Sequence, residues 1–316
     1  MAIFSATLSQ TAVLLLFIVI GYILSKWHFV PDNAQATLSK LENNCLVPAL
    51  VMGTFIEQFT VDKITVARDL LLSSLGLTIL GIVVSVLLVR LFSKDRYERN
   101  IYAYGLCFSN FGFMGNAVVG ALFPEIFLEY LIFTLPLWTL IYLYGVPNLL
   151  IGAASGEKPT LAQRLKNFMN PMCISMVVGM VIGICGIPVP GFIQSAISSA
   201  GSCMSPVAML LTGMTIAQFD LKNMLRIPGV YISTVIRLVV YPLIFLGVTM
   251  LLPKEFASST FAICAICSLS MPTGLTSIIV PAAYGQDTRI ASGMALVSHV
   301  LSCLTIPVIF MLFQMI

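Results

Sequence analysis

Two short clusters of glycine, proline and small polar residues interrupt long apolar stretches of this sequence. The first, SNFGFMGN, occupies residues 109–116, and the second, SLSMPTG, occupies residues 268–274. Glycine and proline disfavour helix there, while asparagine, serine and threonine supply hydrogen-bond donors and acceptors. The chemistry expected of these groups is non-covalent binding of a small charged ligand. The candidate ligand-binding residues are Asn110, Gly112, Gly115 and Asn116 in the first cluster and Ser270, Pro272, Thr273 and Gly274 in the second.

A broken helix offers two kinds of backbone group to a ligand. Its amide end behaves like about half a positive charge and suits a carboxylate. Its carbonyl end suits a sodium ion or a proton donor. Neither cluster contains Lys or Arg, so dipoles and amides would hold the anion. For the first cluster alone a close-packing seam is the alternative, and for the second a simple proline kink.

Four other polar residues lie inside or at the edge of apolar stretches. We expect Asn44 to line the same cavity as the two clusters. Arg237 and His299 are candidates for proton or ion coupling, because ionisable groups within a membrane commonly serve function and histidine titrates near neutral pH. A structural role, bonded to backbone or packed between helices, stays open for both. Glu42, close to Lys40, is expected to face solvent.

Composition places the chain among membrane proteins. It has 316 residues, 59% of them hydrophobic and 9% charged, with a mean hydropathy of +1.01, whereas a soluble domain has about 25% charged residues. The net charge of +3 is too small to suggest a nucleic-acid partner. Only two histidines are present, so no His-Glu-x-x-His zinc motif exists, and the few intramembrane acids form no evident catalytic pair. We therefore expect neither an enzyme nor a cofactor.

The apolar pattern predicts an all-α fold with ten transmembrane helices, since each crossing needs about 20 residues. Of the 16 basic residues, 12 lie in or beside the odd-numbered connections and 3 in the even-numbered ones. The positive-inside rule then predicts cytoplasmic odd connections and both termini outside the cytoplasm. The predicted spans are 8–27, 38–56, 70–92, 99–122, 127–152, 171–187, 191–217, 229–252, 257–281 and 289–314.

Weak internal similarity divides the chain into two halves. The segment Cys45-Leu46-Val47-Pro48-Ala49-Leu50 recurs 158 residues later as Cys203-Met204-Ser205-Pro206-Val207-Ala208. The two broken stretches match at a similar offset. We expect residues 1–155 and 156–316 to form two five-helix repeats, which are inverted because each contains an odd number of spans.

The residues from Ser270-Met271-Pro272 to Thr305-Ile306-Pro307, with Val280-Pro281-Ala282-Ala283-Tyr284-Gly285-Gln286-Asp287 between them, carry a family resemblance. Over its whole length the chain resembles the auxin efflux carrier family, whose bacterial members are often described as malate or malonate permeases and whose plant members are the PIN-type exporters. The resemblance implies a fold similar to bile-acid sodium symporters. It also implies a scaffold of spans one, two, six and seven, and a moving transport unit of spans three to five and eight to ten in which spans four and nine cross. A homodimer in the lipid bilayer is implied as well.

The expected function is secondary active transport of small organic anions, such as malate, malonate or auxin-like acids, across the cell membrane by an elevator-type movement. The coupling ion is expected to be a proton or sodium. A non-transporting sensor or channel with the same fold is the alternative. One departure matters: many relatives have an apolar residue and a proline after the glycine, where this chain has Asn116 and Ala117.

Overall fold

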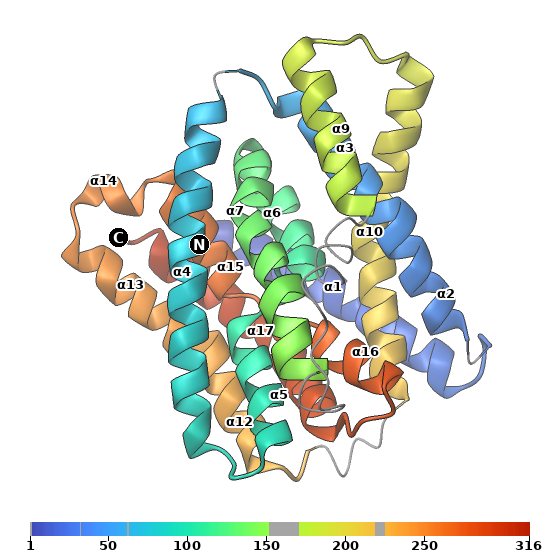
Figure 1. Cartoon of the computed structure of the whole chain (residues 1–316), viewed down its shortest axis with the longest axis vertical. Coiled ribbons are helices and arrows are strands. Elements are labelled where there is room, and N and C mark those ends of the chain that lie inside the picture. The colour runs from blue at the N-terminus through green and yellow to red at the C-terminus, as the bar shows by residue number, and fades with distance from the viewer. Residues whose placement is uncertain (1, 32, 62, 152–170, 219–224) are drawn as a thin grey trace.

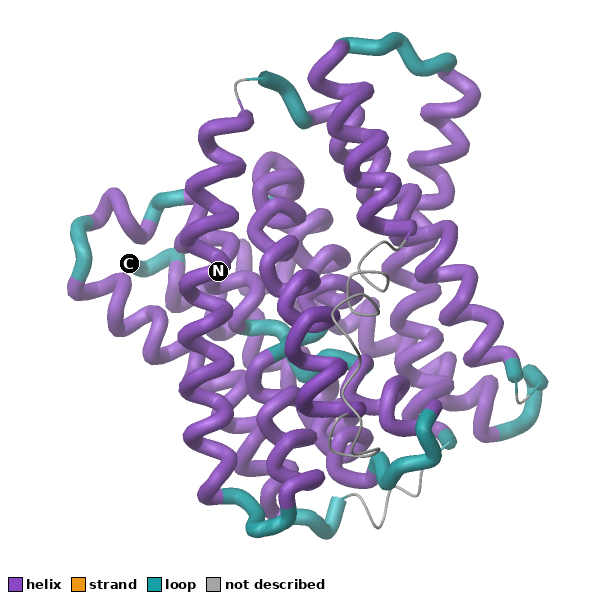
Figure 2. Tube along the Cα trace, in the orientation of Figure 1, coloured by secondary structure: helices purple, strands orange, loops and turns teal. Residues whose placement is uncertain are grey.

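The computed structural model describes residues 2–31, 33–61, 63–151, 171–218 and 225–316, and its regular elements are helices (Figures 1 and 2). The expected boundary between the two halves, at residue 155, lies outside these ranges. In the first half the elements are α1 (Ala2–Lys26), α2 (Ala34–Leu41), η1 (Glu42–Leu46), α3 (Val47–Gln58), α4 (Lys63–Leu88), η2 (Val89–Leu91), α5 (Arg96–Cys107), η3 (Phe111–Gly115), α6 (Asn116–Leu122), η4 (Pro124–Ile126), α7 (Phe127–Leu140) and η5 (Ile141–Ile151). In the second half they are α9 (Pro171–Cys185), α10 (Gly191–Ala217), α12 (Pro228–Val235), η6 (Ile236–Val240), α13 (Tyr241–Leu251), α14 (Lys254–Ala257), α15 (Thr260–Leu269), α16 (Thr276–Ala283) and α17 (Arg289–Phe313).

Each of the ten predicted spans coincides with one or more of these helices. Among the described residues, six helical segments are long and apolar enough to cross a membrane, and they match predicted spans one, three, five, seven, eight and ten. Spans four and nine divide into shorter helices, as the glycine and proline clusters predict. The protein is thus an all-helical membrane protein, and the crossing of the remaining four spans stays a prediction.

Helices α1 and α10 touch through their backbones. A Cβ atom added at Gly21 of α1 would lie 2.1 Å from the carbonyl oxygen of Leu210, and one added at Gly213 of α10 would lie 1.9 Å from that of Ile18. Glycine alone permits this approach. Helices α3 and α9 pack against each other and α3 against α10, so α1, α2, η1, α3, α9 and α10 form one group, called the scaffold group below.

The remaining elements pack around α7 and α17 and are called the crossed-helix group. Helices α4 and α15 contact α7, while α5 and α12 contact α17. In Figure 1 most of this group lies to the left of α3, α9 and α10. The outer face of α4 is apolar and open, with Leu72 64% and Leu80 59% exposed. In a membrane protein such a face lies against lipid.

Wide, π-helical turns accompany prolines in three helices. Pro48 follows η1, Pro242 follows η6, and Pro147 lies within η5. A proline donates no hydrogen bond and its ring crowds the carbonyl four residues earlier. In all three cases that carbonyl belongs to the wide turn, which relieves the clash.

Candidate substrate-binding site

The two helix breaks cross at the centre of the crossed-helix group. Ser109 and Thr273 form an antiparallel bridge. The amide of Asn110 donates to the carbonyl of Pro272 at 2.7 Å, and the amide of Gly274 donates to that of Phe108 at 3.1 Å. Phe108 and Pro272 are 164 residues apart in the sequence, as are Asn110 and Gly274. The two breaks therefore make equivalent hydrogen bonds to each other. The amide two residues after Phe108 bonds to Pro272, and the amide two residues after Pro272 bonds to Phe108.

Local chemistry explains why the chain opens here. Pro272 has no amide to continue α15, and its carbonyl is free to accept from the other break. Gly274 is needed for close approach, since a Cβ there would lie 3.1 Å from the carbonyl oxygens of both Phe108 and Ser109. The break thus replaces helical hydrogen bonds with a short sheet-like pairing, which keeps most backbone groups satisfied.

The amide ends of the two following helices stay open. The first hydrogen bond of η3 runs from the amide of Gly115 to the carbonyl of Asn110 at 3.0 Å. The amides of residues 111–113 donate to no residue that the structure describes, and neither do those of residues 275 and 276. These are the groups expected to attract an anion.

Arg237 occupies the opposite, carbonyl ends of the broken helices. It is 3% exposed, and its guanidinium donates to the carbonyls of Leu106 (3.2 Å), Ser268 (3.1 Å) and Met271 (3.2 Å). Leu106 lies at the end of α5 and Ser268 at the end of α15. A cation at a helix C-terminus complements its dipole. Two roles were considered for Arg237, ion coupling and a structural role. Its bonds to three carbonyls support the structural role.

His299 of α17 forms a hydrogen bond with the first helix break. Its Nε2 lies 2.9 Å from Nδ2 of Asn110, and its Nδ1 lies 2.7 Å from the carbonyl oxygen of Ala295. The neighbouring Ser298 accepts the amide of Thr273 at 3.1 Å. Asn110 and His299 are 3% and 1% exposed, so this network is buried.

Gly112 and Gly115 serve packing rather than an open cavity. A Cβ at Gly112 would lie 2.5 Å from the Trp138 ring, and one at Gly115 would lie 2.2 Å from the Tyr130 hydroxyl. That hydroxyl donates to the carbonyl of Phe111 at 3.1 Å. The packing alternative considered for these two glycines therefore describes their surroundings.

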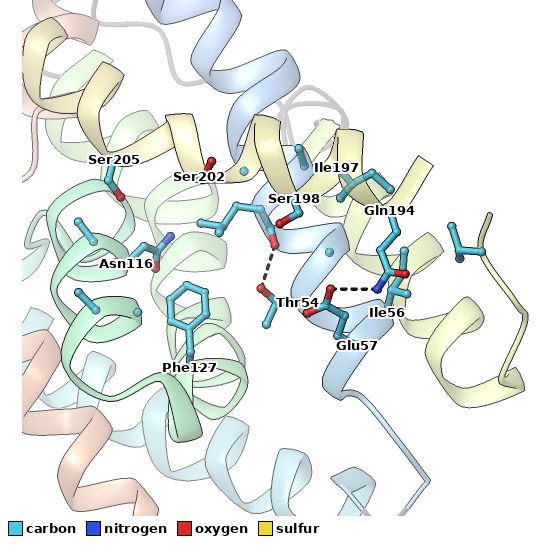
Figure 3. Close-up of a pocket in the computed structure, with 18 residues that line it drawn as sticks. Thr54, Ile56, Glu57, Asn116, Phe127, Gln194, Ile197, Ser198, Ser202 and Ser205 are labelled. Atoms are coloured by element: carbon cyan, nitrogen blue, oxygen red, sulfur yellow. Dashed lines mark hydrogen bonds between the residues drawn. The ribbon is translucent and has the colours of Figure 1, made fainter. Parts of the chain in front are cut away.

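Asn116 lines a recess of about 480 Å³ between the two groups of helices (Figure 3). Its side chain extends toward α10, where Ser202 and Ser205 lie. It is 6% exposed, and its Oδ1 has no hydrogen-bond partner. Glu57 and Gln194 lie across the recess and bond to each other at 3.2 Å. The other recess-lining residues include Leu50, Gly53, Thr54, Ala117, Gly120, Phe127, Ile197, Ser198 and Gly201.

The other predicted residues lie outside this recess. The Ser270 hydroxyl donates to the carbonyl of Ile266 at 2.7 Å, within its own helix. Asn44 is exposed, and its side chain donates to the carbonyl of Lys40 at 2.7 Å. The expectation for Glu42 is wrong. Its side chain is fully buried where η1 packs on α10, and neither carboxylate oxygen has a hydrogen-bond partner.

Sequence reasoning missed the scaffold side of the recess. Ser202 and Ser205 look like ordinary small residues of an apolar helix. The repeat offset of 158 residues was the available signal, because it matches Ser202 to Asn44, which was already a candidate. Thr54 has a match at the same offset, Thr212, but its hydroxyl is satisfied by the carbonyl of Leu50 at 2.9 Å.

Comparison with known families completes this description. A family model described as "Membrane transport protein" matches residues 7–310. No curated protein matches the chain. The match spans nearly the whole sequence, including both helix breaks, and agrees with the resemblance drawn from residues 270–307. The protein is therefore a multi-pass membrane transporter and belongs to the membrane transport protein family, that of the auxin efflux carriers.

Proposed function

We propose that this transporter carries small organic anions, and that the crossed-helix group moves past the scaffold group to expose the bound anion on alternate sides. The observation that carries the proposal is the charge of Arg237. Its guanidinium is buried and bonded to three carbonyls, yet it forms no ion pair with any acid among the residues that the structure describes. A buried charge without a counterion is costly, so an anion bound nearby is favoured.

The groups available to such an anion are neutral donors. At the crossing, the amides of residues 111–113 and 275–276 have no acceptor among the described residues. At the recess, Asn116 and Ser205 supply side-chain donors, whereas the Ser202 hydroxyl already donates to the carbonyl of Ser199 at 2.8 Å. No Lys or Arg lines the recess. Hydrogen bonds without direct ion pairing hold a carboxylate loosely enough for release, which a carrier requires. Substrates in the size range of malate or malonate suit a recess of about 480 Å³.

Sodium coupling at the crossing is disfavoured. The carbonyls that would bind sodium in a broken-helix transporter already accept from Arg237. A second cation there would be repelled by the guanidinium. We therefore propose that transport does not depend on sodium and that any coupling uses a proton, with His299 as the titrating group.

The internal repeat suggests how the binding site becomes accessible from the other side of the membrane. Ser202 lines the present recess, and Asn44 is its match in the other half of the scaffold group at an offset of 158 residues. Asn44 is exposed in this conformation. We propose that it lines the corresponding recess when the crossed-helix group has moved, and that the scaffold groups of two copies form a homodimer.

Counterflow in proteoliposomes tests this function. Vesicles loaded with unlabelled malate or malonate should accumulate the labelled compound with no product formed, and replacing sodium by potassium should leave the rate unchanged. A panel of other carboxylates, including an indole acid, should compete. A sensor or channel would show no counterflow, and a sodium requirement would contradict the role given to Arg237.

A further inference from the structure

Three arginines surround a second recess at the junction of α4 and α5. Arg90 of η2 and Arg96 and Arg99 of α5 line a cavity of about 540 Å³. Arg90 and Arg96 are exposed and Arg99 is half-buried. The side chains of Asn100, Tyr144 and Asn148 complete its polar lining. None of these residues takes part in the crossing or in the recess at Asn116.

The three positive charges have no counterion within the described ranges of the chain. None of the three arginines forms an ion pair or hydrogen bond with a residue that the structure describes. The nearest acids in the sequence are engaged otherwise: Asp95 Oδ1 accepts the amide of Glu98 at 2.9 Å, and Glu98 Oε2 accepts the Ser93 hydroxyl at 2.6 Å. The recess therefore presents three guanidinium groups that are not paired with any described acid.

Helix stability does not account for these arginines. Arg96 and Arg99 lie in the first turn of α5, whose N-cap is Asp95. The N-terminus of a helix carries partial positive charge, so basic residues there are unfavourable. The helix dipole therefore does not explain their presence in that turn.

An apolar stripe runs along the outer surface of α4 and η2, and its last two residues flank Arg90 in the sequence. Leu80, Val84, Leu87 and Leu91 recur at spacings of three and four residues, which places them on one helix face. They are 59%, 41%, 55% and 84% exposed. Val86 and Leu149 add apolar surface to the recess itself. Cationic donors at the end of a lipid-facing stripe match a molecule with an anionic head and apolar tails.

We propose that this recess binds the phosphodiester headgroup of an anionic phospholipid, whose acyl chains lie along the stripe on α4. The guanidinium groups suit phosphate oxygens because of their planar, multiple donors. The Tyr144 hydroxyl lines the same recess and can donate as well. The connection between α4 and α5 is one that the distribution of basic residues places in the cytoplasm, where anionic lipid attracts basic clusters. Since α4, α5 and η5 belong to the crossed-helix group, bound lipid would hold that group to one leaflet.

Native mass spectrometry of the full-length protein in detergent tests the proposal independently of transport. The probes are dioleoyl phosphatidylglycerol, dioleoyl phosphatidylcholine and inorganic phosphate. The variants are the double exchange Arg90→Gln/Arg96→Gln, the single exchange Arg99→Gln, and Lys254→Gln as the control, an exposed basic residue of α14 outside the recess.

Wild type and the Lys254→Gln control should bind phosphatidylglycerol more tightly than phosphatidylcholine. Each arginine removed should weaken that binding about fivefold. Equal binding of phosphatidylglycerol to wild type and the arginine variants would overturn the proposal, as would equal binding of the two lipids. Full displacement of the lipid by millimolar phosphate would also overturn it, because the recess would then be a site for a soluble anion. If the arginine variants do not purify as folded protein, lipid binding by Arg90→Lys/Arg96→Lys decides: retained preference for phosphatidylglycerol supports the site and its loss overturns it.

Discussion

The side-chain amide of Asn110 donates a hydrogen bond to Nε2 of His299 across 2.9 Å. The direction of this bond follows from the other side of the ring, because the carbonyl of Ala295 can only accept and so requires the proton on Nδ1. The neutral histidine is then fully satisfied. A second proton on Nε2 would face the NH₂ group of Asn110 and force that amide to turn. The first helix break is thereby linked to the residue proposed for proton coupling.

Replacing Asn110 with Ala should reduce transport at least about tenfold, because it leaves His299 Nε2 unpaired and removes a side chain at the crossing, a loss of about 1–3 kcal/mol. Counterflow rates measure it. Asn43→Ala is the matched control, since Asn43 is exposed and bonds only to Ser39. Wild-type rates in the Asn110 variant would remove this residue from the site.

The variant His299→Gln should flatten the pH dependence of transport, because glutamine does not titrate. The rate is measured at several pH values in proteoliposomes. The control is His28→Asn: His28 has a φ of 55°, a conformation that asparagine tolerates. A profile in the His299 variant that matches wild type would return His299 to a packing role.

Loss of the guanidinium in Arg237→Met should lower the melting temperature strongly, by the equivalent of about 2 kcal/mol or more, because three buried carbonyls lose their donor. Arg237→Lys keeps the charge but not the spread of donors, and should be intermediate in stability while retaining anion counterflow. An Arg237→Met protein that melts like wild type and transports anions would refute both the stabilising role of the three hydrogen bonds and the charge argument.

At the recess, Asn116→Asp should impair transport more than Asn116→Ala. The two exchanges remove the same amide, but the aspartate adds a negative charge where a carboxylate is proposed to bind. Folding should change little in the alanine variant, since Oδ1 of Asn116 has no partner to lose. KM for the substrate is the quantity to compare. Equal effects of the two exchanges would argue against an anionic substrate at this position.

Glu42 gives a prediction about stability. Both of its carboxylate oxygens are buried without partners, and a buried charge is costly. The neutral isostere in Glu42→Gln should therefore raise the melting temperature at pH 8 by a few degrees. Lys40→Gln, an exposed neighbour, is the control. A lower melting temperature in the Glu42 variant would mean that the carboxylate has a stabilising partner.

The breaks in spans four and nine could be predicted because their causes are local. Pro272 lacks an amide, and Gly274 alone tolerates the close approach at the crossing. The partners of Arg237 could not, because the carbonyls of Leu106 and Ser268 come from segments 131 and 31 residues away. An apolar helix sequence does not reveal which neighbour its buried cation meets.

Glu42 shows a different limit of prediction from the sequence. Its closeness to Lys40 in the sequence suggested a solvated position, but the wide turn η1 before Pro48 turns it toward α10. The role of Gly112 also depended on a distant residue, since Trp138 fills the space beside it. Periodicity and breaker residues indicate where helices run and stop. Which side chains meet in the interior depends on packing that short motifs do not encode.

The direct backbone contact between α1 and α10 has a consequence for how the molecule can tolerate change. A methyl group at Gly21 or Gly213 would collide with a carbonyl oxygen, and neither helix has a flexible side chain there to yield. The two backbones therefore leave no room for any side chain at these positions. Substitutions at these two glycines should disturb the packing of the whole protein, however far they lie from any ligand.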